Sequence, residues 1–209
     1  MIKTFIADDH VIVRRGLRQI VAETPEIVIA GEAGTGQEAI REVLSKDYDV
    51  ILLDITMPDL NGLDVLKELK RQRPEIRVLM LSMHPEEQFA IRSLKAGALG
   101  YLTKDSAPAE LVGAIKKVAT GGRYISTTLG EKLASQLTDD SDKEPHETLA
   151  DREYQIMQMI ARGLSIQRIA KELFLSTSTI YTYRTRILRK LQIRSNAELI
   201  RYATDNHLA

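Results

Sequence analysis

The sequence predicts an α/β domain built on a doubly wound parallel sheet, followed by a small all-α domain. Over residues 1–120, short runs rich in Ile, Val and Leu alternate with stretches that have helical spacing. Such runs suit strands buried on both faces of a parallel sheet, and their alternation with helices implies right-handed crossovers. The later residues hold helical patterns only, and a length of 209 residues is enough for two small domains.

Five apolar runs in the first 120 residues are predicted to be the strands. Each is short, and polar or turn-forming residues bound it. In chain order, the predicted strands are Ile2–Ala7, Ile27–Ala30, Val50–Leu53, Val78–Leu81 and Leu99–Leu102.

A helix is predicted after each strand, because apolar residues recur there at intervals of three or four. The turn Asn61-Gly62 opens the third helix, and Gly97 closes the fourth. Pro108 lies near the start of the fifth helix and Gly121-Gly122 follows its end, the usual order of proline and glycine around a helix. In chain order, the apolar positions are Val11, Leu17, Ile20 and Val21; Ala39, Ile40, Val43 and Leu44; Leu63, Leu66 and Leu69; Phe89, Ile91 and Leu94; and Leu111, Ile115 and Val118.

The composition excludes several classes of site. The chain has no cysteine, which removes disulfides, thiolate metal sites and cysteine nucleophiles and fits a reducing compartment. No apolar run reaches about 18 residues, so no membrane span is expected. No Gly-x-Gly-x-x-Gly follows the first strand and no Walker-type loop occurs, so nucleotide sites of those kinds are not expected.

The formal net charge of zero conceals an uneven distribution. Residues 1–120 carry a net charge of −2, residues 121–147 carry −3 and residues 148–209 carry +5. We therefore expect a mildly acidic domain at 1–120, an acidic linker at 121–147 and a basic domain at 148–209. A basic terminal domain favours binding to nucleic acid.

Polar residues follow four of the predicted strands where each strand ends. Asp8 and Asp9 follow the first strand, Asp54 the third, Ser82 the fourth and Lys104 the fifth. Each alone could be a helix cap or a solvated charge, but in an open α/β sheet these strand ends share one edge, where sites form. Clustered carboxylates and a phosphate suit Mg²⁺, and a carboxylate can then attack phosphorus. The metal ion and Lys104 would offset the charge that develops.

Four motifs surround these residues: Asp8-Asp9, the run Leu52–Gly62, Leu81-Ser82, and the run Ala96–Lys104. Together they resemble the receiver domain of two-component response regulators over residues 1–120. The resemblance implies a flavodoxin-like sheet in the order 2-1-3-4-5. It also implies roles for single residues: Asp54 as phosphoacceptor; Asp8, Asp9, Asp54 and the backbone carbonyl of Thr56 as ligands of Mg²⁺ or Mn²⁺; Ser82 and Lys104 as phosphoryl contacts; and Tyr101 as a switch.

Three residues near this pocket have plainer interpretations as well. Tyr101 is either a switch coupled to Ser82 or a half-buried aromatic residue of the fifth strand. His10 and His84 are interpreted as structural or solvated residues rather than as phosphate relays.

Residues 121–147 are predicted to join the two domains. Leu129, Leu133 and Leu137 lie at intervals of four, so a short amphipathic helix is expected there. Residues 138–147 have almost no apolar side chains, which predicts a flexible linker.

Four helices are predicted from residue 149 onward. Gly163 ends the first, and Ser176 is the expected N-cap of the third. A short helix joined by a tight turn to a longer, basic helix forms a helix-turn-helix signature. The four predicted helices are Asp151–Arg162, Ile166–Leu173, Ser176–Leu191 and Asn196–Ala203.

The helix at 176–191 is predicted to enter the major groove of DNA, which admits a helix of about 10 Å diameter. The alternative is a basic, solvated helix in a small bundle. The predicted DNA contacts lie on or beside the outward face of this helix; they are Thr179, Tyr181, Thr182, Arg184, Thr185, Arg186, Arg189 and Lys190.

Leu149–Glu153, Ile160–Ser165, Leu175-Ser176 and Lys190-Leu191 resemble the DNA-binding domain of LuxR-type regulators, over about residues 148–205. The two resemblances together identify the chain as a NarL/FixJ-type response regulator. The run Tyr183–Arg186 is similar to the GacA/UvrY branch of that family.

These inferences predict a phosphorylation-controlled transcription regulator rather than an enzyme. A partner histidine kinase would phosphorylate Asp54, and a homodimer would then bind double-stranded DNA in the cytoplasm, with no role for a membrane. Two alternatives stay open. One is a regulator whose receiver is only a docking module. The other is a phosphatase that uses Asp54 as nucleophile, which Thr56 disfavours because such enzymes place an acid/base Asp at that position.

Overall fold

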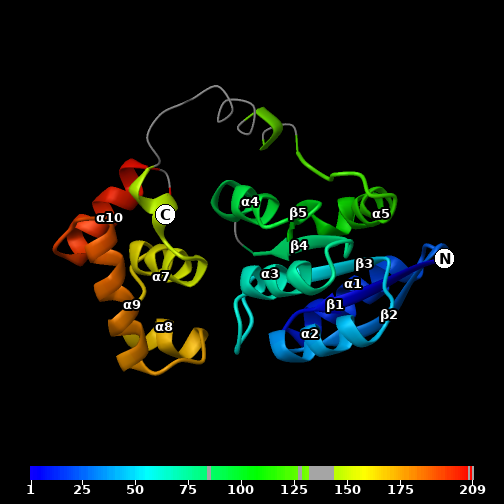
Figure 1. Cartoon of the computed structure of the whole chain (residues 1–209), viewed down its shortest axis with the longest axis horizontal. Coiled ribbons are helices and arrows are strands. Elements are labelled where there is room, and N and C mark those ends of the chain that lie inside the picture. The colour runs from blue at the N-terminus through cyan, green and yellow to red at the C-terminus, as the bar shows by residue number, and fades with distance from the viewer. Residues whose placement is uncertain (84–85, 127–128, 132–143, 207, 209) are drawn as a thin grey trace. The chain divides into compact units, whose positions relative to one another are not determined.

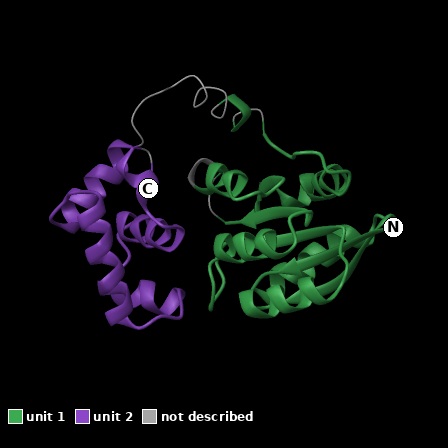
Figure 2. Cartoon of the chain, in the orientation of Figure 1, with its two compact units in different colours: residues 1–139 green, residues 140–209 purple. Residues whose placement is uncertain are grey.

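The computed structural model describes residues 1–83, 86–126, 129–131, 144–206 and 208. The chain forms two compact units, residues 1–139 and 140–209 (Figure 2). His84, most of the helix predicted around Leu133 and most of the predicted flexible linker lie outside the described residues.

The first unit is built on a parallel sheet in the order β2-β1-β3-β4-β5, which confirms the expected order (Figure 1). Strand β2 extends three residues beyond the prediction, because its pairing with β1 continues through Gly31 and Glu32 after a shift in register. β2 lies at the edge of the sheet, where exposed and buried residues alternate, so an apolar run does not mark its full length. The strands are β1 (Ile2–Ala7), β2 (Ile27–Ala33), β3 (Val50–Asp54), β4 (Val78–Ser82) and β5 (Gly100–Thr103).

Helices cover both faces of this sheet (Figure 1). Helix α1 packs against α5, α2 packs against α3, and α4 lies beside β5. The local signals act as predicted: the side chain of Asn61 accepts the amide of Leu63 at 2.8 Å, and Gly97 and Gly121 have φ angles of 100° and 82°. The helices are α1 (Val11–Ala22), α2 (Gly36–Ser45), α3 (Gly62–Gln72), α4 (Glu86–Lys95) and α5 (Ala107–Ala119).

The chain after α5 folds back onto the edge of β5. The amide of Tyr124 donates to the carbonyl of Leu99 at 2.8 Å, and Tyr124 forms an isolated parallel bridge with Gly100. The hydroxyl of Ser126 donates to the carboxylate of Glu86, the first residue of α4. We call residues 122–126 the strap, because they tie the start of the interdomain segment to α4 and β5.

The second unit contains the four predicted helices, together with a 3₁₀ turn that was not predicted. Residues 145–147 fall within the predicted linker, yet they form this turn because His146 bonds to Tyr202. The backbone amide of His146 lies 3.3 Å from the Tyr202 hydroxyl, and its Nδ1 lies 3.0 Å away. The elements are η1 (Pro145–Thr148), α7 (Asp151–Ala161), α8 (Ile166–Glu172), α9 (Thr177–Lys190) and α10 (Asn196–Asp205).

Helix α7 packs against α9 and α10, and α8 packs against α9. Leu173, Ile180 and Ile187 are fully buried in this small core. Across the described ranges of both units, no helix is long and apolar enough to cross a membrane.

Candidate functional site

The carboxyl ends of β1, β3 and β5 bring together the charged residues predicted from the sequence. Ala7 pairs with Leu53 across β1 and β3, so Asp8 lies beside Asp54. The Lys104 ammonium reaches between the two carboxylates, 2.8 Å from Asp8 Oδ2 and 2.7 Å from Asp54 Oδ2. All three side chains are almost completely buried, which makes this a built site rather than a surface ion pair.

Burial controls the electrostatics of this group. Burial raises the pKa of Asp54 to about 6, against the opposing effect of Lys104 and with a further rise from the neighbouring Asp8. Burial alone would lower the pKa of Lys104, but the carboxylates of Asp54 and Asp8 outweigh it and hold that pKa above its ordinary value. Lys104 is therefore a fixed positive charge facing an aspartate that ionises near neutral pH.

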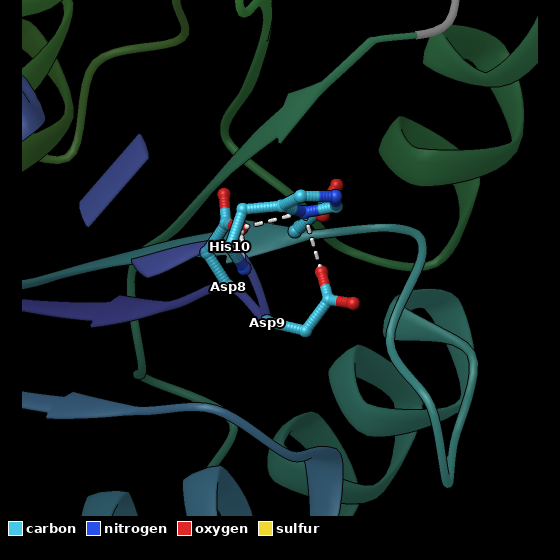
Figure 3. A group of neighbouring side chains, drawn as sticks. Asp8, Asp9 and His10 are labelled. Atoms are coloured by element: carbon cyan, nitrogen blue, oxygen red, sulfur yellow. Dashed lines mark hydrogen bonds and ion pairs between the residues drawn. The ribbon is translucent and has the colours of Figure 1, made fainter. Parts of the chain in front are cut away.

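Asp9 and His10 lie next to Asp8 in the acidic cluster (Figure 3), and His10 is the residue before α1. The backbone amide of His10 donates to Asp8 Oδ1 at 2.8 Å. Its Nδ1 lies 2.7 Å from Asp9 Oδ1 and 3.3 Å from Asp8 Oδ1, as the dashed lines in Figure 3 show. Ligand atoms of Asp8, Asp9, His10 and Asp54 all lie within 4.8 Å of one another. Three carboxylates so close together fit a divalent cation.

The remaining predicted pocket residues lie at the ends of the neighbouring strands. Ser82 is fully buried and pairs with Thr103 across β4 and β5, and its carbonyl accepts the Lys104 amide at 2.8 Å. Tyr101 is buried within β5. Thr56 lies in the loop after β3, where its backbone amide donates to the Asp54 carboxylate.

Two contacts of the loop after β3 were not predicted from the sequence, which indicated only a turn at Gly62. Gly62 passes so close that a Cβ at this position would lie 1.9 Å from the carbonyl oxygen of Asp54. In the same loop, Asp59 accepts the amides of Gly36 at 2.7 Å and Gln37 at 2.8 Å, and so caps helix α2. Burial alone would raise the pKa of Asp59, but these amides outweigh it and lower the pKa below its ordinary value.

Arg14 is a further pocket residue, and it was not predicted from the sequence. Its guanidinium donates to the carbonyl of Asp8 at 2.6 Å from the second turn of α1. Helix α1 carries three arginines, Arg14, Arg15 and Arg18, and nothing in their spacing signals that one of them turns back toward the preceding strand, so only the structure identifies it.

The predicted DNA-contacting residues divide into two groups on α9. The exposed group points away from the helical core and consists of Tyr181, Thr182, Thr185, Arg186 and Arg189. The hydroxyls of Thr182 and Thr185 donate to the carbonyls of Ser178 and Tyr181, four residues earlier, so each offers its methyl group and acceptor lone pairs outward.

The other group forms hydrogen bonds or ion pairs within the second unit and consists of Thr179, Arg184 and Lys190. Arg184 Nε donates to Asn196 Oδ1 at 2.7 Å, and Lys190 Nζ lies 2.6 Å from Glu153 Oε2. Glu153 is buried and also accepts the amide of Ala150 at 2.9 Å, so Lys190 neutralises a carboxylate that caps α7. Thr179 is half-buried, and its hydroxyl lies 2.7 Å from that of Ser176.

Comparison with known families matches each unit to a different one. Residues 4–116 match the response regulator receiver domain, and residues 147–203 match the bacterial regulatory proteins of the luxR family. The two matches coincide with the sheet whose edge carries Asp54 and with the helices that include α9.

Full-length relatives show the same pairing of domains. The response regulator UvrY of Escherichia coli K12 is 36% identical over 204 residues, covering 97% of this chain and 94% of that protein. The response regulator GacA of Pseudomonas syringae is 38% identical over 200 residues, covering 95% and 94%. A structure of the RcsB response regulator of Salmonella typhimurium, 25% identical, covers 97% of this chain and 98% of that chain with a TM-score of 0.56. The chain therefore belongs to the NarL/FixJ-type two-component response regulators, transcription regulators in which a receiver domain precedes a LuxR-type DNA-binding domain.

Proposed function

We propose that Asp54 accepts a phosphoryl group from a partner histidine kinase, and that the modified chain binds DNA as a homodimer. The observation that carries this proposal is the buried triad in which Lys104 bridges Asp8 and Asp54 at 2.8 and 2.7 Å. A carboxylate held next to a fixed cation is suited to attack phosphorus, because the cation opposes the charge that builds on the phosphoryl oxygens.

The residues of the pocket fit Mg²⁺, or Mn²⁺ in its place. Asp8, Asp9 and Asp54 supply clustered carboxylate oxygens, and the loop carbonyl of Thr56 is the fourth proposed ligand. A bound ion would neutralise the phosphoryl oxygens and orient the donor. One ammonium does not balance three carboxylates, and this excess of negative charge favours a cation there.

In the proposed transfer, an oxygen of Asp54 forms a bond to phosphorus while the phosphorus–nitrogen bond of the donor phosphohistidine breaks. The departing imidazole takes up a proton. The new group brings about two negative charges and strong acceptor oxygens. Lys104 can then turn from the carboxylates to a phosphoryl oxygen, and the buried hydroxyl of Ser82 can donate to another. The chain acts as a phosphoacceptor rather than as an enzyme, and at most it removes its own phosphoryl group slowly.

The strap offers a route from the pocket to the interdomain segment. A shift of Ser82 toward the phosphoryl group would move the end of β4, which α4 follows along the chain. Glu86, the first residue of α4, accepts a hydrogen bond from Ser126. We expect the face formed by α4, β5 and α5 to shift with it, with Tyr101 in β5 as the switch, and the hydrogen bond between Ser126 and Glu86 to break.

The exposed face of α9 is the proposed DNA-reading surface. Arg186 and Arg189 suit phosphates or guanine, and the threonine methyl groups suit thymine. A dimer would place two such helices on two half-sites related by a two-fold axis. Action on DNA in turn implies the cytoplasm.

The test is chemical labelling of the full chain. Incubation with acetyl phosphate and Mg²⁺ should add one acid-labile phosphoryl group, and Asp54→Asn should abolish it. Labelling that survives in Asp54→Asn would reject the site. If the wild-type chain takes up no phosphoryl group, the receiver is a docking module. Rapid turnover of a generic phosphoester, lost in Asp54→Asn, would instead identify a phosphatase.

A further inference from the structure

We propose that Phe174, in the turn between α8 and α9, packs its ring against a deoxyribose of the DNA backbone at the edge of the groove that α9 enters. This contact rests on the proposed function in one respect, since it takes α9 as the helix that enters the groove. It goes beyond that function because Phe174 lies outside the predicted set of DNA-contacting residues and because the contact is apolar.

The backbone of Phe174 has a conformation that residues other than glycine rarely adopt. Its φ angle is 54°, which lies in the left-handed region. The amide of Phe174 donates to the carbonyl of Lys171 at 3.3 Å, and the amide of Leu175 donates to that of Ala170 at 2.9 Å. This pair of hydrogen bonds closes the C-terminus of α8 and places residue 174 in the left-handed conformation.

The chain has glycine at the equivalent position after three other helices. Gly97, Gly121 and Gly163 follow α4, α5 and α7, with φ angles of 100°, 82° and 80°. Each lies in the same pair of backbone hydrogen bonds as Phe174. Glycine avoids the clash of Cβ with the backbone that makes this conformation unfavourable. The helix end therefore needs no side chain at position 174, and a phenylalanine there costs stability.

Burial of the Phe174 side chain does not offset this cost. The side chain is 67% exposed, whereas Leu173 before it is fully buried and Leu175 after it is half-buried. An aromatic ring left mostly in water contributes little hydrophobic stabilisation to the fold. An unfavourable backbone and an exposed ring at the same residue indicate that the ring contacts another molecule.

The position of Phe174 within the helix-turn-helix indicates that DNA is this molecule. In the motif, the first helix crosses the DNA backbone and the second enters the major groove. The turn that joins them therefore lies at the edge of the groove, where the sugar-phosphate strand runs. Residues 148–209 carry a net charge of +5, and α9 begins with the exposed residues Thr177 and Ser178. The exposed ring is thus continuous with the surface proposed to contact DNA.

The chemistry of the ring selects the deoxyribose within that strand. A phenyl ring has no hydrogen-bond donor to offer a phosphate, but it can pack against the apolar carbons of the sugar. Contacts to the sugar carry no sequence information, so the ring should strengthen binding to any sequence. It neutralises no phosphate, so it should add nothing to the salt dependence of binding.

The experiment measures DNA affinity by fluorescence anisotropy at several salt concentrations. The full chain, treated with acetyl phosphate and Mg²⁺, binds a fragment selected from a random pool. Phe174→Gly and Phe174→Asn remove the ring and suit the left-handed backbone. We expect each to weaken binding by at least about fivefold, with the salt slope of log K unchanged. Phe174→Tyr keeps the ring and should bind within about twofold of the wild type.

Thermal unfolding shows whether Phe174 also supports the fold. Phe174→Gly should unfold at the same temperature as the wild type or a few degrees above it, because the strain is removed. Gln192→Gly is the matched control, since Gln192 is exposed after α9 with a φ angle of 57° in the same pair of hydrogen bonds. It removes the same strain and should leave DNA affinity unchanged. Weaker DNA binding by Phe174→Gly together with a lower unfolding temperature would make Phe174 a structural residue of the turn.

Replacing every thymine of the fragment by uracil separates the sugar from the base. The ratio of wild-type to Phe174→Gly affinity should be the same on both fragments. A ratio that falls to one on the uracil fragment would assign the ring to a thymine methyl group and overturn the deoxyribose contact.

The remaining outcomes separate this contact from the proposed function. Unchanged DNA affinity in Phe174→Gly and Phe174→Asn, with Arg186→Ala weakened, would reject the contact and keep α9 as the DNA-reading helix. A wild-type chain that binds no fragment would reject the proposed function and this contact with it.

Discussion

Asp54 shows how burial sets the behaviour of a single residue. Its carboxyl group lies at the carboxyl-terminal edge of the sheet. There, desolvation raises its pKa to about 6 from an ordinary 3.8, despite the nearby ammonium of Lys104. The folded chain therefore holds the Asp54 proton more tightly than the unfolded chain does. Ionising Asp54 costs stability, and this cost appears as the pH rises through about 6.

The first prediction concerns Asp54→Asn in the absence of divalent ions. Below about pH 4 Asp54 is protonated in both states, so the substitution changes the free energy of unfolding little. The difference in the free energy of unfolding between Asp54→Asn and the wild type should favour the variant by roughly 2–3 kcal/mol more at pH 7 than at pH 4, because the amide has no charge to desolvate. Urea denaturation across this pH range measures the difference. Asp105→Asn, at an exposed position after β5, is the control. A difference that does not vary with pH would contradict the raised pKa.

Gly62 shows how a residue with no functional atom can control a site. Its Cα packs against the backbone of Asp54 and Ile55, and an added methyl group would lie 1.9 Å from the Asp54 carbonyl oxygen. That oxygen belongs to the main chain at the end of β3, so it cannot rotate away as a side chain would.

The second prediction is that Gly62→Ala destabilises the chain by about 1–3 kcal/mol or more and slows phosphorylation of Asp54. Gly16→Ala is the matched control, because a Cβ at Gly16 would meet nothing within 4 Å in the middle of α1. It should stabilise the chain by about 0.5–1 kcal/mol. Urea midpoints and labelling rates test both. Equal midpoints for the two variants would refute the close approach.

At the scale of elements, α9 combines an exposed face proposed to contact DNA with a side chain that stabilises the second unit. Arg186 and Arg189 are exposed, whereas Lys190 near the same end of the helix is bonded to the buried carboxylate of Glu153. From the sequence alone, Arg186, Arg189 and Lys190 look alike. This is because nothing in a basic helix indicates that Lys190 pairs with Glu153, 37 residues away along the chain.

The third prediction separates these roles. Arg186→Ala and Arg189→Ala should each weaken DNA binding and reduce the salt slope of log K by about one, with little change in thermal stability. Lys190→Ala should instead destabilise the chain by roughly 1–3 kcal/mol, because it leaves Glu153 buried without a cation. Fluorescence anisotropy at several salt concentrations and thermal unfolding give the two readouts. A Lys190 variant of normal stability that loses one unit of salt slope would reverse the assignment.

The strap provides the fourth prediction. Ser126→Ala removes the hydrogen bond to Glu86 and should weaken the coupling between phosphorylation and DNA affinity by roughly 0.5–2 kcal/mol. Ser45→Ala is the control, because its hydroxyl donates within helix α2, to the carbonyl of Glu42. The measurement is the ratio of DNA affinities with and without acetyl phosphate. Equal ratios in the two variants would exclude the strap from the route.

The sequence predicted well wherever a single pattern controls a whole element. The middle part of each of the five strands and the polar residues at the strand ends can be predicted from the sequence. This is because a parallel sheet buries both faces of its strands and brings their carboxyl ends together. Contacts between segments that are distant in the sequence cannot be predicted from such local patterns. The end of β2, the turn η1 and the partners of Arg184 and Lys190 all depend on residues that meet only in the folded chain.

For the molecule as a whole, the neutral formal charge is a cancellation: residues 1–120 and 121–147 are acidic, and residues 148–209 are basic. The receiver carries an acidic pocket that favours a cation, and the C-terminal domain carries the excess of basic residues. The family matches place a receiver and a LuxR-type domain on these same two parts. The proposed control of DNA binding requires the first part to change the activity of the second.

The central claim is that phosphorylation of Asp54 controls DNA binding, and one measurement tests it most directly. DNA fragments are selected from a random pool on the full chain treated with acetyl phosphate and Mg²⁺. The affinity of the best fragment is then measured with and without the phosphodonor, for the wild type and for Asp54→Asn. The account predicts at least about fivefold tighter binding by the treated wild type and no response in Asp54→Asn. Equal affinity with and without the phosphodonor, or a response that persists in Asp54→Asn, would contradict it.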